Sequence, residues 1–346
     1  MKRSTAILGF LLGTLSATTV VAQDSKLLQL RGEVRVDYTH ERVDNRAIKS
    51  NNGFKGEYLN LRMAGELNSS FSYAFRYRLN RIDTGRRFFD ATDWAYLTYR
   101  ASDRWSFSGG KVVVAIGGYE YERAPIDAYF ASEYWNNVPC YELGINAEYT
   151  LPSGRDKLTL QLTQSPFDSK ENDMYAFGLL WTGNHGWFNT LYSVNMQEYL
   201  PGKFVSYIAL GHRLEFGSCA LELDWMNRAV TGHPYLLHDH SIMGELSWQP
   251  SEKLRIFGKT TYDLNRTGVS GDYCVLPGTE LTRVGMGLEY YPLNRGDNSV
   301  RLHATCCYAW GKNGNPMGTT LPKQLIANVG LTWKGDLLSL TKRNTH

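Results

Sequence analysis

The sequence has few cysteines, and their number and spacing fit neither a disulfide framework nor a structural zinc site. Its 346 residues contain five, an odd and widely scattered set: Cys140, Cys219, Cys274, Cys306 and Cys307. Small exported domains that depend on disulfides carry an even, dense set, so no disulfide framework is predicted. No CxxC stands beside a second CxxC or beside spaced histidines, so a structural zinc site is not predicted either.

Long hydrophobic runs are missing after the first residues. Residues 1–22 have the order of a signal peptide, with Lys2 and Arg3 first, then an apolar stretch, then Ala22 at the cleavage site. Nothing that follows is apolar over the 18 or so residues that a membrane-spanning helix needs. We expect a signal peptide over 1–22 and an exported chain over 23–346; a buried first helix is the alternative.

An excess of charge of one sign is also missing, and so are the common catalytic motifs. Lys and Arg total 37 against 34 Asp and Glu, so the net charge of +3 offers no general attraction for nucleic acid. Neither GxSxG nor HExxH occurs, and GGKVVVAIGG has the spacing of neither phosphate-binding glycine loop. We expect no enzymatic activity, no metal and no cofactor. The alternative, an enzyme at the rim of a barrel, would have to use His233, His238, Asp239 and His240.

Alternation of apolar and polar residues is what the sequence has in abundance. In residues 28–39, Leu28, Leu30, Val34, Val36 and Tyr38 alternate with Gln29, Arg31, Glu33, Arg35, Asp37 and Thr39. The period of two predicts a strand with one apolar face and one polar face. The pattern returns along the whole chain, for example in FSYAFRYRLN, YELGINAEYT, CALELDWM and SVRLHATCCYAW. Oily faces of about nine to eleven residues match strands that cross hydrocarbon at a tilt.

The connections between these strands alternate too. Short joints rich in Gly, Pro, Asn, Asp and Ser lie at 68–70, 102–104, 152–157, 184–186, 250–253 and 294–298. Longer segments lie at 40–53, 81–91, 117–138, 229–239, 266–278 and 311–322. The pattern predicts an all-β fold, a transmembrane antiparallel up-and-down barrel of about 16 strands, wide enough for a water-filled channel. The alternative, a soluble sandwich, would leave charges in the middle of its strands without water.

One connection departs from the rest. A predicted strand over 105–116 runs into Gly117 and Gly118, and about twenty acidic and aromatic residues follow before the chain returns at Pro139. This loop follows the fifth strand, and we expect it to fold into the lumen as a constriction. Its charged residues are Glu120, Glu122, Arg123, Asp127 and Glu133.

The stretches GGKVVVAIGGYEYERAPIDAY and WNNVPCYELG resemble outer-membrane porins of the phosphate-selective porin O/P type, in the branch found in Bacteroidota. The resemblance extends to the individual residues over 105–145. Over most of the chain it is limited to the alternation of apolar and polar residues. It implies an outer-membrane location, contact with lipid and lipopolysaccharide, and, by analogy with wide porins, a homotrimer. Two features depart from the family: Ala115 stands where a proline is frequent, and the barrel is expected to finish at Trp333, leaving a tail over 334–346.

Selectivity for phosphate would require an excess of Arg and Lys in the lumen. Residues of lumen parity instead carry as many acids as bases. The bases expected to line the channel are Arg31, Arg35, Arg62, Arg76, Arg78 and Lys111. We therefore expect a basic wall opposite an acidic loop and weak charge selectivity for small hydrophilic solutes and ions. The alternative is an anion- or phosphate-selective porin.

Overall fold

The computed structural model describes residues 26–81, 88–167, 173–268, 270–295, 298–316 and 318–341. The predicted signal peptide over 1–22 lies outside the described residues. The described chain forms one antiparallel sheet in which each long strand pairs with the next along the sequence. The sheet closes because β1 (Lys26–Val43) also pairs with β17 (Gln324–Thr341) over its full length.

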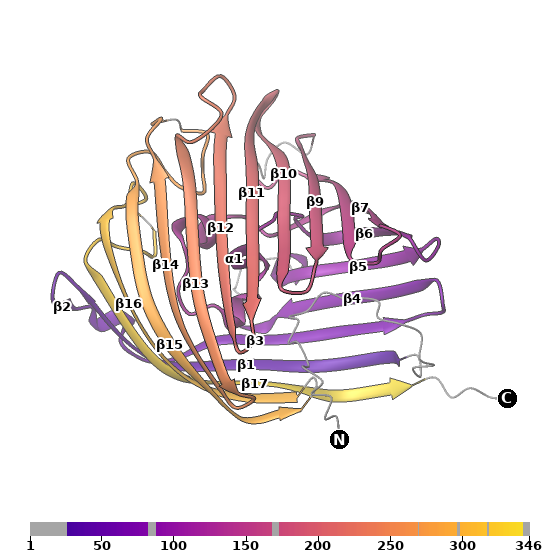
Figure 1. Ribbon diagram of the computed structural model, residues 1–346, viewed down its shortest axis with the longest axis horizontal. Coiled ribbons are helices and arrows are strands. Elements are labelled where there is room, and N and C mark those ends of the chain that lie inside the picture. Colours follow the sequence, from indigo (N-terminus) through magenta and orange to yellow (C-terminus); the bar gives the residue numbers. More distant parts are fainter. Residues whose placement is uncertain are drawn as a thin grey trace.

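Sixteen long strands, β1 and β3–β17, make up the described wall, which confirms the predicted barrel (Figure 1). The two-residue β2 (Arg46–Ala47) only extends the hairpin after β1. The other strands are β3 (Gly53–Glu66), β4 (Phe71–Arg78), β5 (Thr92–Arg100), β6 (Trp105–Val113), β7 (Tyr141–Thr150), β8 (Asp156–Gln164), β9 (Tyr175–Asn184), β10 (Phe188–Leu200), β11 (Lys203–Phe216), β12 (Cys219–Val230), β13 (Asp239–Ser251), β14 (Leu254–Asn265), β15 (Glu280–Arg295) and β16 (Asn298–Lys312).

The helical segments are short and lie between strands. In the long connections these are η1 (Lys49–Asn51), η2 (Leu79–Arg81), η3 (Phe88–Ala91), α1 (Tyr119–Glu122), η4 (Pro125–Asp127) and α2 (Glu133–Asn137). The last three belong to the connection between β6 and β7, and Figure 1 shows α1 within the ring of strands. In the described part of the chain, no helix is both long and apolar enough to cross a membrane.

The last strand extends further than the sequence suggested. β17 continues past Trp333 to Thr341, where Leu338 pairs with Leu30 of β1. Gly335 and Asp336 interrupt the strict alternation there, and a register shift after Leu30 absorbs the interruption. Residues 334–341 of the expected tail are therefore part of the barrel.

The two faces of the strands have the predicted contents. On β1, Glu33, Arg35 and Asp37 are buried inside, while Val36 is 42% exposed and faces outward. Buried charged residues recur on the inner face of every strand from β12 to β16, whereas the outer faces carry large exposed apolar side chains. The interior of this barrel is thus polar, and the exterior is an apolar belt of the kind that faces lipid.

Candidate functional site inside the barrel

The connection between β6 and β7, residues 114–140, folds into the lumen and crosses it. It enters past β10, where the Gly117 N–H donates to Ser193 Oγ at 2.8 Å and the Gly118 N–H to the Leu191 carbonyl at 3.1 Å. A Cβ on Gly117 would lie 2.5 Å from that carbonyl oxygen, and Gly118 has φ +101°. Both positions therefore need glycine, as expected of a sharp inward bend.

The next residues bind strand β12. The N–H groups of Tyr119 and Glu120 donate to the two carboxylate oxygens of Asp224 at 2.9 and 2.7 Å. These are the free N–H groups at the start of α1, so a carboxylate of the barrel wall takes the role of a helix cap. The loop is thus held across the lumen, on strands far from β6 and β7.

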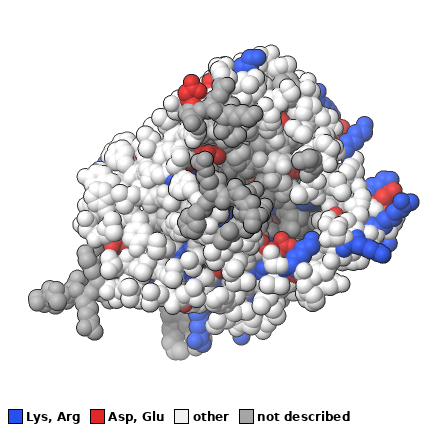
Figure 2. All heavy atoms as spheres, turned by 180° about the vertical axis from the view of Figure 1, so that it is seen from behind, with Lys and Arg blue, Asp and Glu red and all other residues white. Residues whose placement is uncertain are grey.

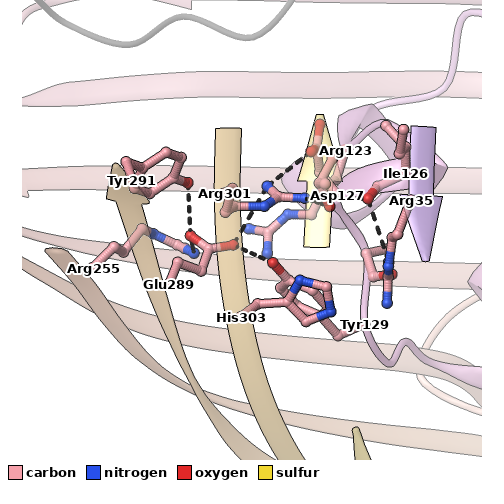
Figure 3. Close-up of polar contacts among 12 residues, drawn as sticks. Arg35, Arg123, Ile126, Asp127, Tyr129, Arg255, Glu289, Tyr291, Arg301 and His303 are labelled. Carbon is pink, nitrogen blue, oxygen red and sulfur yellow. Dashed lines mark hydrogen bonds and ion pairs between the residues drawn. The ribbon is translucent and has the colours of Figure 1, made fainter. Parts of the chain in front are cut away.

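The tip of the loop is bound by ion pairs on both of its sides. Arg123 lies 2.6 Å from Glu245 of β13 and 2.7 Å from Glu222 of β12. Asp127 lies 2.6 Å from Lys334 of β17 and 2.9 Å from Arg301 of β16 (Figure 3). Because all of these groups are largely buried, moving the tip would leave charges in a poorly solvated interior.

These pairs belong to a longer chain of alternating charges along the wall. From β11 to β17 it runs Arg213, Glu222, Arg123, Glu245, Arg255, Glu289, Arg301, Asp127 and Lys334, with neighbours 2.5–3.5 Å apart. The loop supplies two members, Arg123 and Asp127. In such a chain each charge lies beside an opposite one, so its field inside the lumen is largely cancelled.

Tyr129 holds the tip from the side of β1. Its hydroxyl donates to Glu289 at 2.7 Å, and its ring centroid lies 4.6 Å from the Arg35 guanidinium and 4.5 Å from the His303 ring (Figure 3). Arg35 also donates to the carbonyls of Ile126 and Ala128 at 3.3 and 2.6 Å. The Tyr129 ring therefore packs against the cationic Arg35 of β1 and the aromatic His303 of β16.

The loop returns along β14 and β15. Lys259 donates to the Phe130 carbonyl at 3.0 Å and lies 2.7 Å from the Glu120 carboxylate. Arg283 donates to the Ala131 carbonyl at 3.0 Å, and the Glu133 N–H donates to Asp263 at 2.7 Å. An apolar cluster that includes Tyr121, Tyr134, Tyr207 and Cys274 fills the space behind this limb.

Only one of the five predicted charges of the loop is exposed. Glu120 and Asp127 are buried in ion pairs, Arg123 is mostly buried in its two pairs, and Glu133 is buried against Asn137. Glu122 alone has an exposed side chain. The pKa of Asp127 stays well below its usual range: burial alone would raise it, but Lys334 and Arg301 outweigh that effect.

The predicted basic residues fall into three groups. Arg35, Arg76 and Arg78 are buried: Arg35 pairs with Asp37 at 2.6 Å, and the other two pair with Asp93 at 2.7 and 2.9 Å. Arg76 and Arg78 therefore do not form the expected open wall facing the acidic loop, because both are buried and share the single carboxylate of Asp93.

Arg62, in the second group, faces the lumen beside Glu33 at 3.1 Å and keeps 35% of its side chain exposed. Arg31 lies opposite Arg62 in the register of β1 and β3, and it is partly exposed.

Lys111 forms the third group. It pairs across the sheet with Ala95 of β5 and Leu143 of β7, and Leu143 is one of the exposed apolar residues of the outer face. Its ammonium donates to the Phe89 carbonyl at 3.3 Å and lies 5.3 Å from the Phe89 ring. Its position in the register thus places Lys111 with the outward residues rather than with the channel lining.

Two residues of the site were missed from the sequence. Asp93 has outward parity in the run Thr92–Arg100, and only a register shift between Arg76 and Tyr77 of the neighbouring strand turns it inward. Lys334 was assigned to the tail. Neither residue could be recognised from its local sequence. The inward orientation of Asp93 depends on a bulge, and that of Lys334 depends on where β17 ends.

The remaining candidate groups have structural roles or none. Asp239, the first residue of β13, accepts hydrogen bonds from the N–H groups of Arg266 and Thr267 at 2.7 and 3.1 Å and so ties the start of β13 to the loop after β14. The five cysteines are free thiols. In the ranges that the structure describes, no group of three or more His, Cys, Asp or Glu side chains could hold a metal ion.

Comparison with known proteins agrees with this architecture. Residues 28–187 match the family described as phosphate-selective porin O and P. No curated protein sequence matches the chain. Among solved structures, the chain is similar to a trimer form of OmpT, an outer membrane protein of Vibrio cholerae, with TM-score 0.64 and 13% identity over 90% of this chain and 100% of that one.

Two other solved structures are similar. The outer membrane channel DcaP of Acinetobacter baumannii has TM-score 0.62 and 12% identity over 89% of this chain and 97% of that one. The anion-selective porin from Comamonas acidovorans has TM-score 0.61 and 11% identity over 89% and 99%. The predicted Bacteroidota branch stays a prediction. With its closed 16-strand barrel and inward loop, the chain has the fold of outer-membrane porins, and its residues 28–187 match the phosphate-selective porin O and P family.

Proposed function

We propose that this porin is a water-filled channel for small hydrophilic solutes and ions, that its charge selectivity is weak, and that it is not an enzyme. The observation that carries the proposal is the alternating chain of ion pairs from Arg213 to Lys334. The loop contributes one base, Arg123, and one acid, Asp127, to this chain, so its two members of the chain add no net charge to it.

Part of the lumen wall on β3, β7 and β8 is not covered by the loop. Lumen-facing side chains remain partly exposed there, among them Arg62, Glu148 and Lys157. On β12–β15 the corresponding charged residues Glu222, Glu245 and Glu289 are buried under the loop. Solutes therefore pass a wall that carries both signs, together with the exposed Glu122 of the loop, and charges of both signs favour neither cations nor anions strongly.

Anion selectivity is the second candidate function. It is favoured by the exposed Arg62, by the family description, and by the relative from Comamonas acidovorans that is itself named an anion-selective porin. Strong phosphate selectivity would require bases without acid partners. The wall offers few of these, because Arg35, Arg62, Arg76 and Arg78 all have a carboxylate within 3.1 Å.

The same relatives suggest the assembly. One of them forms a trimer, and we propose a homotrimer for this chain, surrounded by outer-membrane lipid and lipopolysaccharide. The apolar outer belt would contact the acyl chains, while the long loops would face the cell exterior.

Swelling of proteoliposomes in solutions of neutral sugars tests the channel. We expect entry of small sugars, with a rate that falls steeply as the sugar grows, and no swelling with protein that has been unfolded by heat. Impermeability to all sugars while the barrel stays folded would contradict the channel.

A further inference from the structure

A pocket lies on the outer surface of the barrel, at the long-loop end of β1, β16 and β17. It has room for about 110 Å³ and is lined by Arg42, Asp44, Asn45, Tyr308, Lys323 and Leu325. Arg42 pairs with Leu325 across β1 and β17, and Leu325 pairs with Tyr308 across β17 and β16. These three residues form one outward-facing row, so the pocket opens away from the lumen.

The rim of the pocket carries two bases, Arg42 and Lys323, and one acid, Asp44, and it is well fixed. Asp44 and Asn45 occupy left-handed conformations (φ 48° and 64°) in the tight turn before β2, and the Asp44 N–H donates to the Lys323 carbonyl at 3.1 Å. The turn is thereby tied to the loop between β16 and β17. Two cations, Arg42 and Lys323, are held at the pocket before any ligand arrives.

Most of the donors of these cations remain available. Within the described chain Arg42 donates only to the Asn45 carbonyl, at 2.7 Å, and the Lys323 side chain is 64% exposed although Asp44 lies 3.2 Å away. Arg46 and Lys49 of the same hairpin add further positive charge. Figure 2 shows Lys and Arg side chains gathered around one acidic patch at the edge of the molecule where the β2 hairpin projects.

The floor of the pocket continues into the apolar belt. Tyr308 is 42% exposed, and below it along the same strands lie the exposed Tyr38, Val329, Leu331 and Val36. From Arg42 to Val36 the strand extends over about 20 Å, at 3.3 Å per residue. A basic rim above an apolar column matches an anionic head group with acyl chains beneath it.

We propose that this pocket binds a phosphorylated lipid of the outer leaflet, with its phosphate on Arg42 and Lys323 and an acyl chain along Tyr308 and Leu325. Guanidinium and ammonium groups form strong charge-assisted hydrogen bonds with phosphate oxygens. The inference rests on the proposed function, because only a barrel in the outer membrane presents this face to lipid. It adds a defined lipid site outside the channel.

Native mass spectrometry of the folded full chain in detergent tests the site. The probes are diphosphorylated lipid A, the same lipid after removal of its phosphates, and inorganic phosphate. We expect one tightly bound lipid A per chain, and binding at least tenfold weaker after removal of the phosphates. Inorganic phosphate at millimolar concentration should not compete, and competition would show that the ligand is free phosphate instead.

Variants locate the lipid. The double variant Arg42→Ser with Lys323→Ser should bind lipid A at least tenfold more weakly, whereas Arg46→Ser with Lys49→Ser, outside the pocket but on the same hairpin, should stay within about twofold of the parent. Equal loss in both variants, or no loss in either, would refute the site. Channel conductance of the pocket variant should match the parent. If the protein binds lipid A in this way but does not conduct ions, the proposed channel function is refuted and the proposed lipid site still holds.

Discussion

The Glu120 carboxylate lies 2.7 Å from the Lys259 ammonium, whereas Glu122, two residues further on, is exposed. The two acids therefore have different tasks although they are neighbours in the sequence. Glu120 fastens the loop to β14, and Glu122 is left to act on passing ions.

Glu122→Gln should shift the permeability of the channel towards anions at pH 8 and above, where the Glu122 carboxyl is ionised although desolvation raises its pKa to about 7. Glu120→Gln should leave the selectivity nearly unchanged but destabilise the docked loop, since Lys259 then loses its buried partner. Reversal potentials in a salt gradient measure the first effect, and urea midpoints measure the second. Equal shifts of selectivity in both variants would contradict this division.

Arg62→Ser should shift selectivity towards cations, because Arg62 is a partly exposed base of the lumen wall. The double variant Arg76→Ser with Arg78→Ser serves as its matched contrast. It removes two bases that are buried on Asp93, so its main effect should be a loss of stability of about 3 kcal/mol or more. A larger selectivity shift in the double variant than in Arg62→Ser would place Arg76 and Arg78 in the ion path.

Asp127→Asn should destabilise the barrel by about 3 kcal/mol at neutral pH, because Arg301 and Lys334 lose their shared carboxylate. Lys334 and Arg301 lower the pKa of Asp127 against the opposing effect of burial, so the stabilisation is complete above the ordinary Asp value of about 3.9. It is lost as the pH falls through the lower pKa of the folded state.

The difference in urea midpoint between the parent and Asp127→Asn should therefore be constant from pH 8 down to about pH 4 and shrink below that value. A difference that shrinks already between pH 7 and pH 5 would mean that Asp127 is not held as a carboxylate by its two partners.

Ile145→Arg should destabilise the barrel far more than Asn146→Arg. Ile145 is 59% exposed on the outer face of β7, and the next residue has the opposite, lumen-facing parity and accepts a hydrogen bond from Gln161. An arginine facing lipid near the middle of the bilayer costs about 2–4 kcal/mol, whereas the lumen is wet. Unfolding by urea in lipid vesicles measures both variants, and equal losses would mean that the two faces have been exchanged.

The barrel could be predicted from the sequence because a period of two is a local property. The alternation from Leu28 to Thr39 predicts which side chains face lipid, and in the structure Glu33, Arg35 and Asp37 are buried inside the barrel as expected. The inward loop could also be predicted, because its length and the pair Gly117–Gly118 are visible in the chain.

The partners inside the lumen could not be predicted, because they join strands far apart in the sequence. Asp93 turns inward only through a bulge, Lys334 lies in a strand whose end was misjudged, and Lys259 reaches Glu120 only once the loop has crossed the lumen. A count of charges by parity included Lys111, which faces outward, and missed Asp93 and Lys334. It could not tell which charges remain exposed.

The selectivity of the unmodified channel is the decisive quantity. Reversal potentials of the parent in planar bilayers, measured across a salt gradient at low and high ionic strength, should show only a few-fold preference for either sign. That preference should fade towards 1 M salt, where the screening length is about 3 Å. Strong anion selectivity with a block by phosphate that saturates would contradict a lumen of matched charges.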